Sequence, residues 1–302
     1  MSKKINKDKK GSIEESRLGF RTWIEIDRKA IANNYKVFRS LIKKSTKLLS
    51  VVKSNAYGHG LVDFSKTVSD LGVDWLAVDS IVEAIRLRDE GIDKPVLVLG
   101  YTLPEKMQEA IDKKISLSLS NMFSLKGLLG LKLKGQIRAH IKIDSGMHRQ
   151  GFMEPELEDV VDFLKKHKDT IEVQGLYTHF AAAKDPEHPE DTDGQVIVFE
   201  KWISAFKKAG FTPIVHAAAT GATILFPNTH YDMVRVGIGF HGLWPSVEVQ
   251  SHFEKKMSLM PTFSWKTIIS EIKELPVGER IGYDFTFTVK KKTKIAVCPI
   301  GY

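Results

Sequence analysis

Short runs of valine, leucine and isoleucine recur along the first 240 residues, and longer segments with an apolar residue every three or four positions separate them. A continuous apolar run of four to eight residues is typical of a buried strand, and the three-to-four spacing is typical of a helix with one buried face. The runs that predict strands lie at residues 48–53, 75–78, 96–100, 116–119, 139–144, 171–178, 213–217 and 233–237. The segments that predict helices lie at residues 28–43, 60–71, 80–91, 104–113, 121–131, 155–167 and 193–209.

Eight predicted strands, each separated from the next by a helix-length segment, indicate an α/β fold, a (β/α)8 barrel of eight strands. The connection between the last two strands, AATGATILFPNTHYD, is short, and its helix is only weakly indicated. A doubly wound sheet therefore remains an alternative.

The pattern changes from about residue 247, after which apolar and polar residues alternate in PTFSWKTIISEIKEL and ERIGYDFTFTV. Such alternation, with the turn LPVGE between the two stretches, predicts a mostly antiparallel β domain. We therefore divide the chain into a basic tail at 1–20, a barrel domain at 21–246 and a partial β domain at 247–302. The segment RTWIEID, at residues 21–27, precedes the first helix and is expected to pair with the β domain.

Composition narrows the classes of protein to which the chain can belong. A hydrophobic fraction of 42% in 302 residues suffices for a sizeable core, whereas no apolar run reaches the ~18 residues of a membrane span. The net charge of +8 comes from lysines scattered along predicted helices and in the tail, without a nucleic-acid-binding motif. The tail lacks the apolar segment of a signal peptide, and we expect it to be disordered. The one cysteine, Cys298, allows no internal disulfide and suits a reducing cytoplasm.

Unusual polar residues and glycines follow the predicted strands at their C-terminal ends, where barrels place their functional groups. In chain order, these residues are Lys53, Lys142, Asp144, Arg149, His179, Thr220, Arg235 and Gly237. Because the strands of a barrel run parallel, all of these residues are expected at one end of it, where they would form a single site.

Most of these residues have a structural explanation as well as a functional one. Lys53, in SVVKSNAYGHG, could form a Schiff base or simply reach solvent from a strand end. Gly237, in VRVGIG, could free backbone N–H groups for a phosphate or serve a tight turn. His179 could belong to the core or stack on a planar ligand, and Thr220 could cap a helix or contact a phosphate. Arg235 favours a site, because a buried guanidinium without a partner is costly.

Five separated motifs together resemble those of the alanine racemase family. VVKSNAYGHG is similar to the family's pyridoxal-phosphate lysine motif, and the family's later motifs are matched in order by IKIDSGMHRQGF, LYTHFAAA, MVRVGIGFHG and RIGYDFTF. The likeness extends from about residue 21 to residue 302. It implies an eight-stranded barrel followed by a β domain, the cofactor pyridoxal phosphate and a homodimer that shares its active sites.

The resemblance also implies residue roles. Lys53 would hold the cofactor covalently and act as one proton-transfer base, and Tyr283 would be the second base, delivered from the partner subunit. Arg149 would lie close to the second base with Lys142 in support; the lysine at that place is carbamylated in some relatives. Further cofactor contacts are implied for Tyr57, His179, Thr220, Arg235, Gly237 and Ile238. No metal ion is implied.

The chemistry of these residue types fits racemisation. Two bases on opposite faces of the substrate, Lys53 and Tyr283, can remove the Cα proton from one face and return another on the opposite face. A tyrosine is a poor base near neutral pH, so it needs a cationic neighbour such as Arg149. Arg235 would meet the pyridine nitrogen as a permanent donor and leave it unprotonated, which weakens the ring as an electron sink and disfavours a long-lived carbanion.

The resemblance predicts an enzyme that interconverts L- and D-alanine and supplies D-alanine for peptidoglycan. The alternatives are a racemase for serine or for several amino acids, a non-catalytic pyridoxal-phosphate-binding protein, and a decarboxylase, which would use an acidic partner where this chain has Arg235. Thr220 replaces the serine of many relatives but keeps its hydroxyl group. The chain stops at CPIGY, where family members continue. We therefore expect the chain as given to bind the cofactor but to be a weak or inactive catalyst.

Overall fold

The computed structural model describes residues 19–301, so the predicted tail at 1–20 lies almost entirely outside the described residues. The chain forms two compact units. One unit runs from Asp27 to Thr262, and the other joins the residues up to Ile26 with those from Phe263 onward. The larger unit includes α11 (Val247–Phe253). No helix within residues 19–301 combines the length and the apolar character that crossing a membrane requires.

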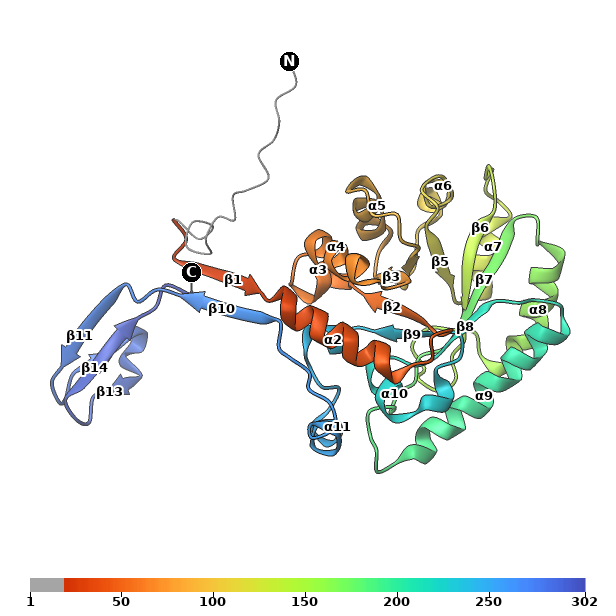
Figure 1. The fold of residues 1–302 in the computed structure, drawn as a ribbon. Helices are drawn as coiled ribbons and strands as arrows, with labels where there is room; N and C mark the ends of the chain where they lie inside the picture. Colours follow the sequence, from red (N-terminus) through yellow and green to blue (C-terminus); the bar gives the residue numbers. More distant parts are fainter. Residues whose placement is uncertain (1–18, 302) are drawn as a thin grey trace, which may run out of the picture. The chain divides into compact units, whose positions relative to one another are not determined.

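The larger unit is built on one sheet of eight parallel strands, in the order β8-β7-β6-β5-β4-β3-β2-β9 (Figure 1). The strands are β2 (Lys47–Val51), β3 (Trp75–Val78), β4 (Val96–Val98), β5 (Ser116–Leu119), β6 (Ile137–Lys142), β7 (Ile171–Tyr177), β8 (Ile214–His216) and β9 (Met233–Val236). The backbone N–H groups of Asp232 and Arg235 donate to the carbonyl groups of Val215 and Ala218, at 3.0 and 2.9 Å, and these bonds link the two end strands. The predicted eight-stranded barrel is confirmed, and the doubly wound alternative is wrong.

Helices alternate with the strands along the chain and cover the barrel. They are α2 (Arg28–Leu41), α4 (Leu61–Leu71), α5 (Ile81–Asp89), α6 (Met107–Asp112), α7 (Met122–Leu128), α8 (Leu157–Lys166), α9 (Pro189–Lys208) and α10 (Thr220–Leu225). Single 3-10 turns are η1 (Pro104–Lys106), η2 (Glu154–Glu156), η3 (Pro227–Thr229) and η4 (Ile238–His241). The weakly indicated connection between the last two strands thus holds the six-residue helix α10 and η3.

The barrel interior explains why the strands appear as continuous apolar runs. Parallel strands are buried on both faces, inside by one another and outside by the helices. Leu49, Trp75, Leu97 and Met233 come from four different strands and pack into one cluster within the barrel. Side chains of this size fill the interior, so the barrel is a packed scaffold whose strand ends can carry a site.

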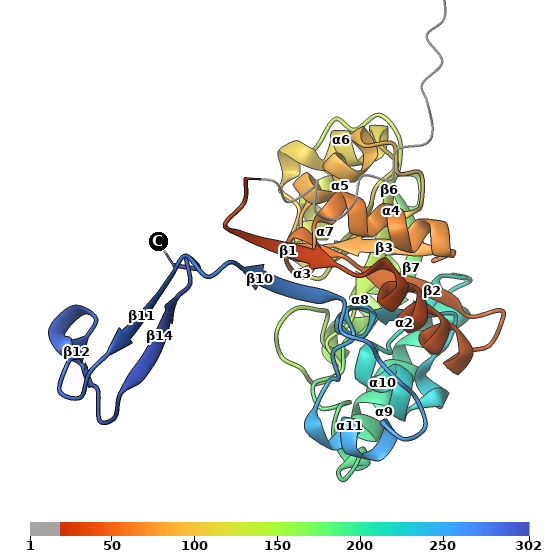
Figure 2. The ribbon, with the colours of Figure 1, turned by 60° about the vertical axis from the view of Figure 1, so that its left-hand side comes forward.

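The smaller unit consists of antiparallel pairs. β1 (Thr22–Ile26) pairs with β10 (Phe263–Thr267), β11 (Glu271–Leu275) with β14 (Thr293–Val297), and β12 (Arg280–Ile281) with β13 (Phe287–Thr288). Figure 2 shows β11 and β14 side by side. The 3-10 turn η5 (Tyr283–Phe285) lies between β12 and β13. The segment 21–27 therefore contributes β1 to a sheet with a C-terminal strand.

Candidate active site

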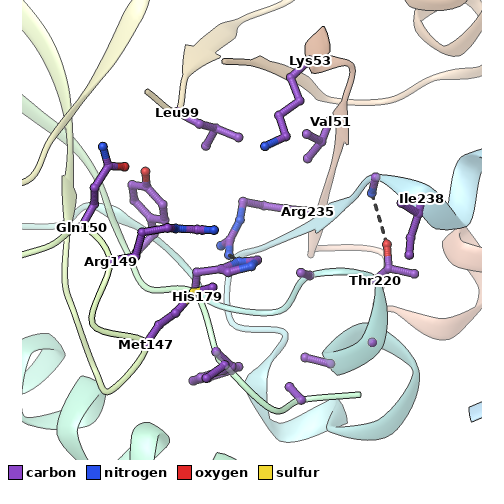
Figure 3. A pocket seen from close by; sticks show the side chains of 18 of the residues that line it. Val51, Lys53, Leu99, Met147, Arg149, Gln150, His179, Thr220, Arg235 and Ile238 are labelled. Carbon is purple, nitrogen blue, oxygen red and sulfur yellow. Dashed lines mark hydrogen bonds between the residues drawn. The ribbon is translucent and has the colours of Figure 1, made fainter. Parts of the chain in front are cut away.

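A cavity of about 850 Å³ lies at the C-terminal ends of the barrel strands. It brings together nine of the residues that the sequence nominated: Lys53, Tyr57, Lys142, Arg149, His179, Thr220, Arg235, Gly237 and Ile238. Figure 3 shows Lys53, Arg149 and His179 pointing toward the same space around Arg235. Two other nominated residues do not line it: Asp144 lies in the loop after β6, and Tyr283 lies in η5 of the smaller unit, where it is 94% exposed.

Lys53 begins a turn of rare handedness. β2 ends at Val51, two residues earlier than expected, and the next element is the short helical turn α3 (Lys53–Tyr57). Ser54, Asn55, Ala56 and Tyr57 have φ values of 55°, 56°, 52° and 53°, which makes this a left-handed turn. Left-handed helical backbone costs about 1–2 kcal/mol per non-glycine residue. Four consecutive residues of the turn carry this free-energy cost, so interactions with the rest of the barrel must offset it.

Two side chains hold this turn. The Asn55 side chain accepts a hydrogen bond from the Leu61 backbone N–H at 2.9 Å, and the Glu83 carboxylate accepts one from the Asn55 backbone N–H at 3.2 Å. Ala56 is fully buried. The turn places the Lys53 ammonium group 3.9 Å from the Asp79 carboxylate, at the edge of the cavity.

Thr220 and two nearby glycines form an anion-suited corner of the cavity. The Thr220 hydroxyl accepts a hydrogen bond from the backbone N–H group of Gly237 at 3.2 Å, drawn as a dashed line in Figure 3, and another from that of Gly239 at 3.4 Å. Thr220 is the first residue of α10, and the N-cap position belongs to Ala219, so the capping alternative for Thr220 is wrong. A Cβ atom at Gly237 would lie 2.7 Å from the Tyr57 hydroxyl. Glycine is therefore required there for Tyr57 to approach this corner.

Arg235 is a buried cation whose hydrogen-bond partners are neutral. Only 3% of it is exposed, and burial lowers its pKa to about 10, so it remains charged at neutral pH. Its guanidinium donates to the backbone carbonyl groups of Thr178 and Ala217, both at 2.8 Å, and to Nδ1 of His216 at 3.0 Å. Within residues 19–301, no carboxylate lies within ion-pair distance of it.

Arg235 fixes the tautomers of two buried histidines. Because a guanidinium can only donate, His216 accepts at Nδ1 and carries its proton on Nε2, from which it donates to Nδ1 of His140 at 2.9 Å. Burial, reinforced by the charge of Arg235, lowers the pKa of His216 well below its ordinary value. Burial lowers the pKa of His140 to about 3. Both imidazole rings are therefore neutral at neutral pH and add no charge near the cavity.

His179 contacts the guanidinium from the cavity side. Its Nδ1 lies 3.3 Å from Nη2 of Arg235. Burial, followed by the charges of Arg235 and Arg149, lowers the pKa of His179 to about 3. The ring is therefore neutral and lies in the cavity wall, which suits contact with a planar uncharged ring.

Two further cations of the cavity are Lys142, the last residue of β6, and Arg149, in the loop that follows it. Asp144 accepts backbone hydrogen bonds from Gly146, His148 and Arg149 at 3.0, 2.9 and 3.1 Å, and so shapes this loop. Burial opposes ionisation of Asp144, but the bonds from His148 and Gly146 outweigh it and hold the pKa below its ordinary value. Burial, then the charges of Arg149 and Arg235, lowers the pKa of Lys142 to about 8.

Sequence reasoning missed three groups of the site. Asp79, directly after β3, lines the cavity. The Tyr177 ring stacks on His216 with a centroid distance of 4.8 Å, and the Arg235 guanidinium lies 5.3 Å from the Tyr177 centroid. The signal for Tyr177 and His216 was present, because each is the polar last residue of a barrel strand.

The site combines a lysine amine, an anion-suited corner and a buried guanidinium in one cavity. The amine can attack an aldehyde, the corner offers hydroxyl and backbone donors to a phosphate, and Arg235 can donate to a neutral acceptor. Within residues 19–301, no group of three or more histidine, cysteine or acidic residues is arranged to hold a metal ion. The donor set therefore suits a phosphorylated aldehyde.

Comparison with protein families gives two matches that cover most of the chain. The model of the N-terminal domain of alanine racemase matches residues 26–245, and the model of the C-terminal domain matches residues 262–302. The chain belongs to the alanine racemase family. Membership of the alanine racemase family makes the chain an isomerase that racemises an amino acid.

Curated relatives and solved structures agree with this membership. Alanine racemase 2 of Oceanobacillus iheyensis is 39% identical over 287 residues, which are 93% of this chain and 71% of the relative. The alanine racemase of Methanococcus maripaludis is 39% identical over 284 residues, 93% of this chain and 75% of the relative. The structure of alanine racemase from Bacillus anthracis with bound L-Ala-P has a TM-score of 0.85 at 33% identity, covering 91% of this chain and 71% of that one. The structure from E. faecalis has a TM-score of 0.86 at 28% identity, covering 94% and 76%.

Proposed function

We propose that the chain is a pyridoxal-phosphate-dependent racemase that interconverts L- and D-alanine with Lys53 and Tyr283 as its two bases. The observation that carries the proposal is the convergence of Lys53, Arg235 and the Thr220–Gly237 corner on one cavity. The names of the relatives support alanine as the substrate. In this proposal the enzyme acts in the cytoplasm and its D-alanine enters peptidoglycan.

The residues fit the cofactor in three places. The Lys53 amine would hold its aldehyde carbon covalently, Tyr57 with the Thr220–Gly237–Ile238 corner would bind its phosphate, and His179 would contact the ring face. Arg235 would donate to the pyridine nitrogen. Bound in this way, pyridoxal phosphate supplies an electron-withdrawing ring that makes the Cα proton of the substrate acidic.

The chain's own residues would then carry the proton. Lys53 takes the proton from, or returns it to, one face of Cα, and Tyr283, supplied by the second subunit of a homodimer, serves the opposite face. Arg149, with Lys142 beside it, would hold the tyrosine in its working state and bind the substrate carboxylate. Since Arg235 cannot give up its proton, it leaves the pyridine nitrogen unprotonated and favours rapid return of the substrate proton over side reactions.

The cofactor link is tested by borohydride reduction in the presence of pyridoxal phosphate, followed by digestion and mapping of the pyridoxyl peptide. We expect the label on Lys53, and we expect Lys53→Ala to bind the cofactor without a covalent link. Labelling of Lys142, the buried lysine of the same cavity, would contradict the assignment. Optical rotation with a panel of amino acids then decides between alanine, serine and a broader range of substrates.

The second base is tested by Tyr283→Phe in deuterated solvent. Removing one of two bases should leave Cα proton exchange in one enantiomer of alanine and abolish it in the other. Tyr231→Phe is the matched control, because the Tyr231 hydroxyl donates to Glu200 at 2.7 Å outside the cavity. Equal exchange losses for D- and L-alanine in Tyr283→Phe, with cofactor binding retained, would refute the two-base scheme.

A further inference from the structure

Glu83 connects a helix start to the left-handed turn that carries Lys53. On α5, its carboxylate accepts hydrogen bonds from the backbone N–H groups of Asp79 at 2.9 Å and Ser80 at 3.4 Å, and Ser80 completes a reciprocal capping box. Its other oxygen accepts from the Asn55 backbone N–H at 3.2 Å. One carboxylate therefore serves two different segments of the barrel.

The hydrogen bond from the Asn55 N–H to Glu83 supplies a partner that the turn itself cannot provide. The first N–H groups of any helical turn lack partners inside that turn. Within the described part of the chain, this is the one hydrogen bond that ties residues 53–57 to a residue distant in the sequence, since the remaining bonds of the turn are to residues 52–61. Because Ser54, Ala56 and Tyr57 all disfavour left-handed backbone, a bond from outside the turn shifts its equilibrium toward the observed conformation.

We propose that Glu83 is a positioning residue for Lys53 and Tyr57, and that it raises the affinity for pyridoxal phosphate by stabilising the left-handed turn. Lys53 and Tyr57 both line the cavity and belong to the turn, whereas Glu83 does not line the cavity. Glu83 therefore acts on the cofactor only through the backbone that it holds. This inference rests on the proposed cofactor role of Lys53.

The first test compares Glu83→Ala with Ser80→Ala. Both substitutions remove half of the capping box, but only Glu83→Ala removes the bond to Asn55, together with the bond to the Asp79 backbone. Pyridoxal phosphate is titrated into each apoprotein and followed by absorbance, and thermal unfolding is measured without the cofactor. We expect Glu83→Ala to weaken cofactor binding about tenfold, which corresponds to about 1.4 kcal/mol. Ser80→Ala should lower the unfolding temperature but keep the affinity within about twofold.

The second test asks whether Glu83 acts through backbone strain. Ser54 has a φ of 55° and an exposed side chain, so Ser54→Gly relaxes the left-handed turn without touching the cavity. In the native background Ser54→Gly should change cofactor affinity by less than about twofold. In the Glu83→Ala background it should recover at least about threefold of the lost affinity. If Glu83→Ala does not fold, Glu83→Gln, which keeps the shape and weakens the acceptor, replaces it in the same cycle.

Two results would overturn the inference. One is native cofactor affinity in Glu83→Ala, and the other is an equal effect of Ser54→Gly in both backgrounds, which would leave Glu83 as a helix cap alone. Failure of the proposed function would look different, because the native chain itself would then show no covalent cofactor at Lys53.

Discussion

Replacing Lys142 by methionine should stabilise the apoprotein near neutral pH, although it removes a residue of the site. Lys142 is the last residue of β6 and only 6% exposed. Its ammonium group makes one hydrogen bond, to the Gln150 side chain at 3.3 Å, and no carboxylate within the described residues forms an ion pair with it. Burial and the charges of Arg149 and Arg235 lower its pKa from 10.5 to about 8.

This pKa change sets the size and sign of the effect. A fall from 10.5 to about 8 corresponds to roughly 3 kcal/mol against the folded state. The unfolded chain still binds the proton up to about pH 10.5, whereas the folded chain releases it near pH 8. The penalty is therefore complete below pH 8, and stability recovers as the pH rises from 8 to 10.5. Lys142→Met also loses the Gln150 bond and the cation–π contact with Tyr177, together about 1–2 kcal/mol, so the net gain at pH 7 is about 1–2 kcal/mol.

Urea unfolding of the apoprotein at pH 7 and pH 10 measures this gain. The buffers must be free of carbon dioxide, because a neutral lysine amine can be carbamylated. Lys165→Met is the matched control, since Lys165 is exposed on α8 and its replacement should change stability by no more than about 0.5 kcal/mol. Racemase activity of Lys142→Met should fall as Arg149 loses its neighbour. A destabilised variant at pH 7, or one that still gains stability between pH 8 and 10, would refute the reasoning.

Two further predictions concern a glycine of the site and a buried asparagine. A Cβ atom at Gly221 would lie 2.3 Å from the Ala183 carbonyl oxygen, so Gly221→Ala must displace the start of α10. Titration of this variant with pyridoxal phosphate should show an affinity at least about tenfold weaker. The control Gly127→Ala, at a position with open space around it, should bind the cofactor normally. The fully buried Asn34 side chain donates to the Met260 carbonyl and accepts from the Met260 N–H, both at 2.8 Å. Asn34→Ala should therefore lower the free energy of unfolding, measured in urea, by about 2–4 kcal/mol. A loss below about 0.5 kcal/mol would contradict this role.

The strands were predictable because burial on both faces leaves a direct trace in the sequence. The run at 75–78 matches β3 and the run at 116–119 matches β5, and the other six differ at their ends by one or two residues. The clustering of strand-end residues follows from the same topology, since parallel strands bring their C-terminal ends together. No side-chain contact was needed for that inference, only the order and direction of the strands.

The left-handed turn after β2 could not be predicted, because its residues argue against it. Asparagine tolerates left-handed backbone, but serine, alanine and tyrosine do not favour it, and the sequence placed Lys53 at the end of an extended strand. The conformation depends on Glu83, 28 residues further along the chain, which a local pattern does not register. The chain from Arg235 through His216 to His140 was equally hidden, because it depends on which strands are neighbours in the barrel.

The charge balance of the cavity links stability to binding. Five cations line it, namely Lys53, Lys142, Arg149, Lys184 and Arg235, and Asp79 is its one carboxylate within the described residues. Burial of these cations, and for Lys142 also the charges of Arg149 and Arg235, raises the free energy of the folded chain, as the lowered pKa values of Lys142 and Arg235 show. An anion that binds only the folded state stabilises that state. At a concentration of 100 times its Kd, it raises the free energy of unfolding by about 2.7 kcal/mol. A protein carboxylate beside Arg235 would reduce this cost by forming an ion pair, but it would also compete with an anionic ligand for the guanidinium. In the proposed function, Arg235 with only neutral partners would therefore keep its charge available to anions and would leave the ring nitrogen unprotonated, which favours quick return of the substrate proton.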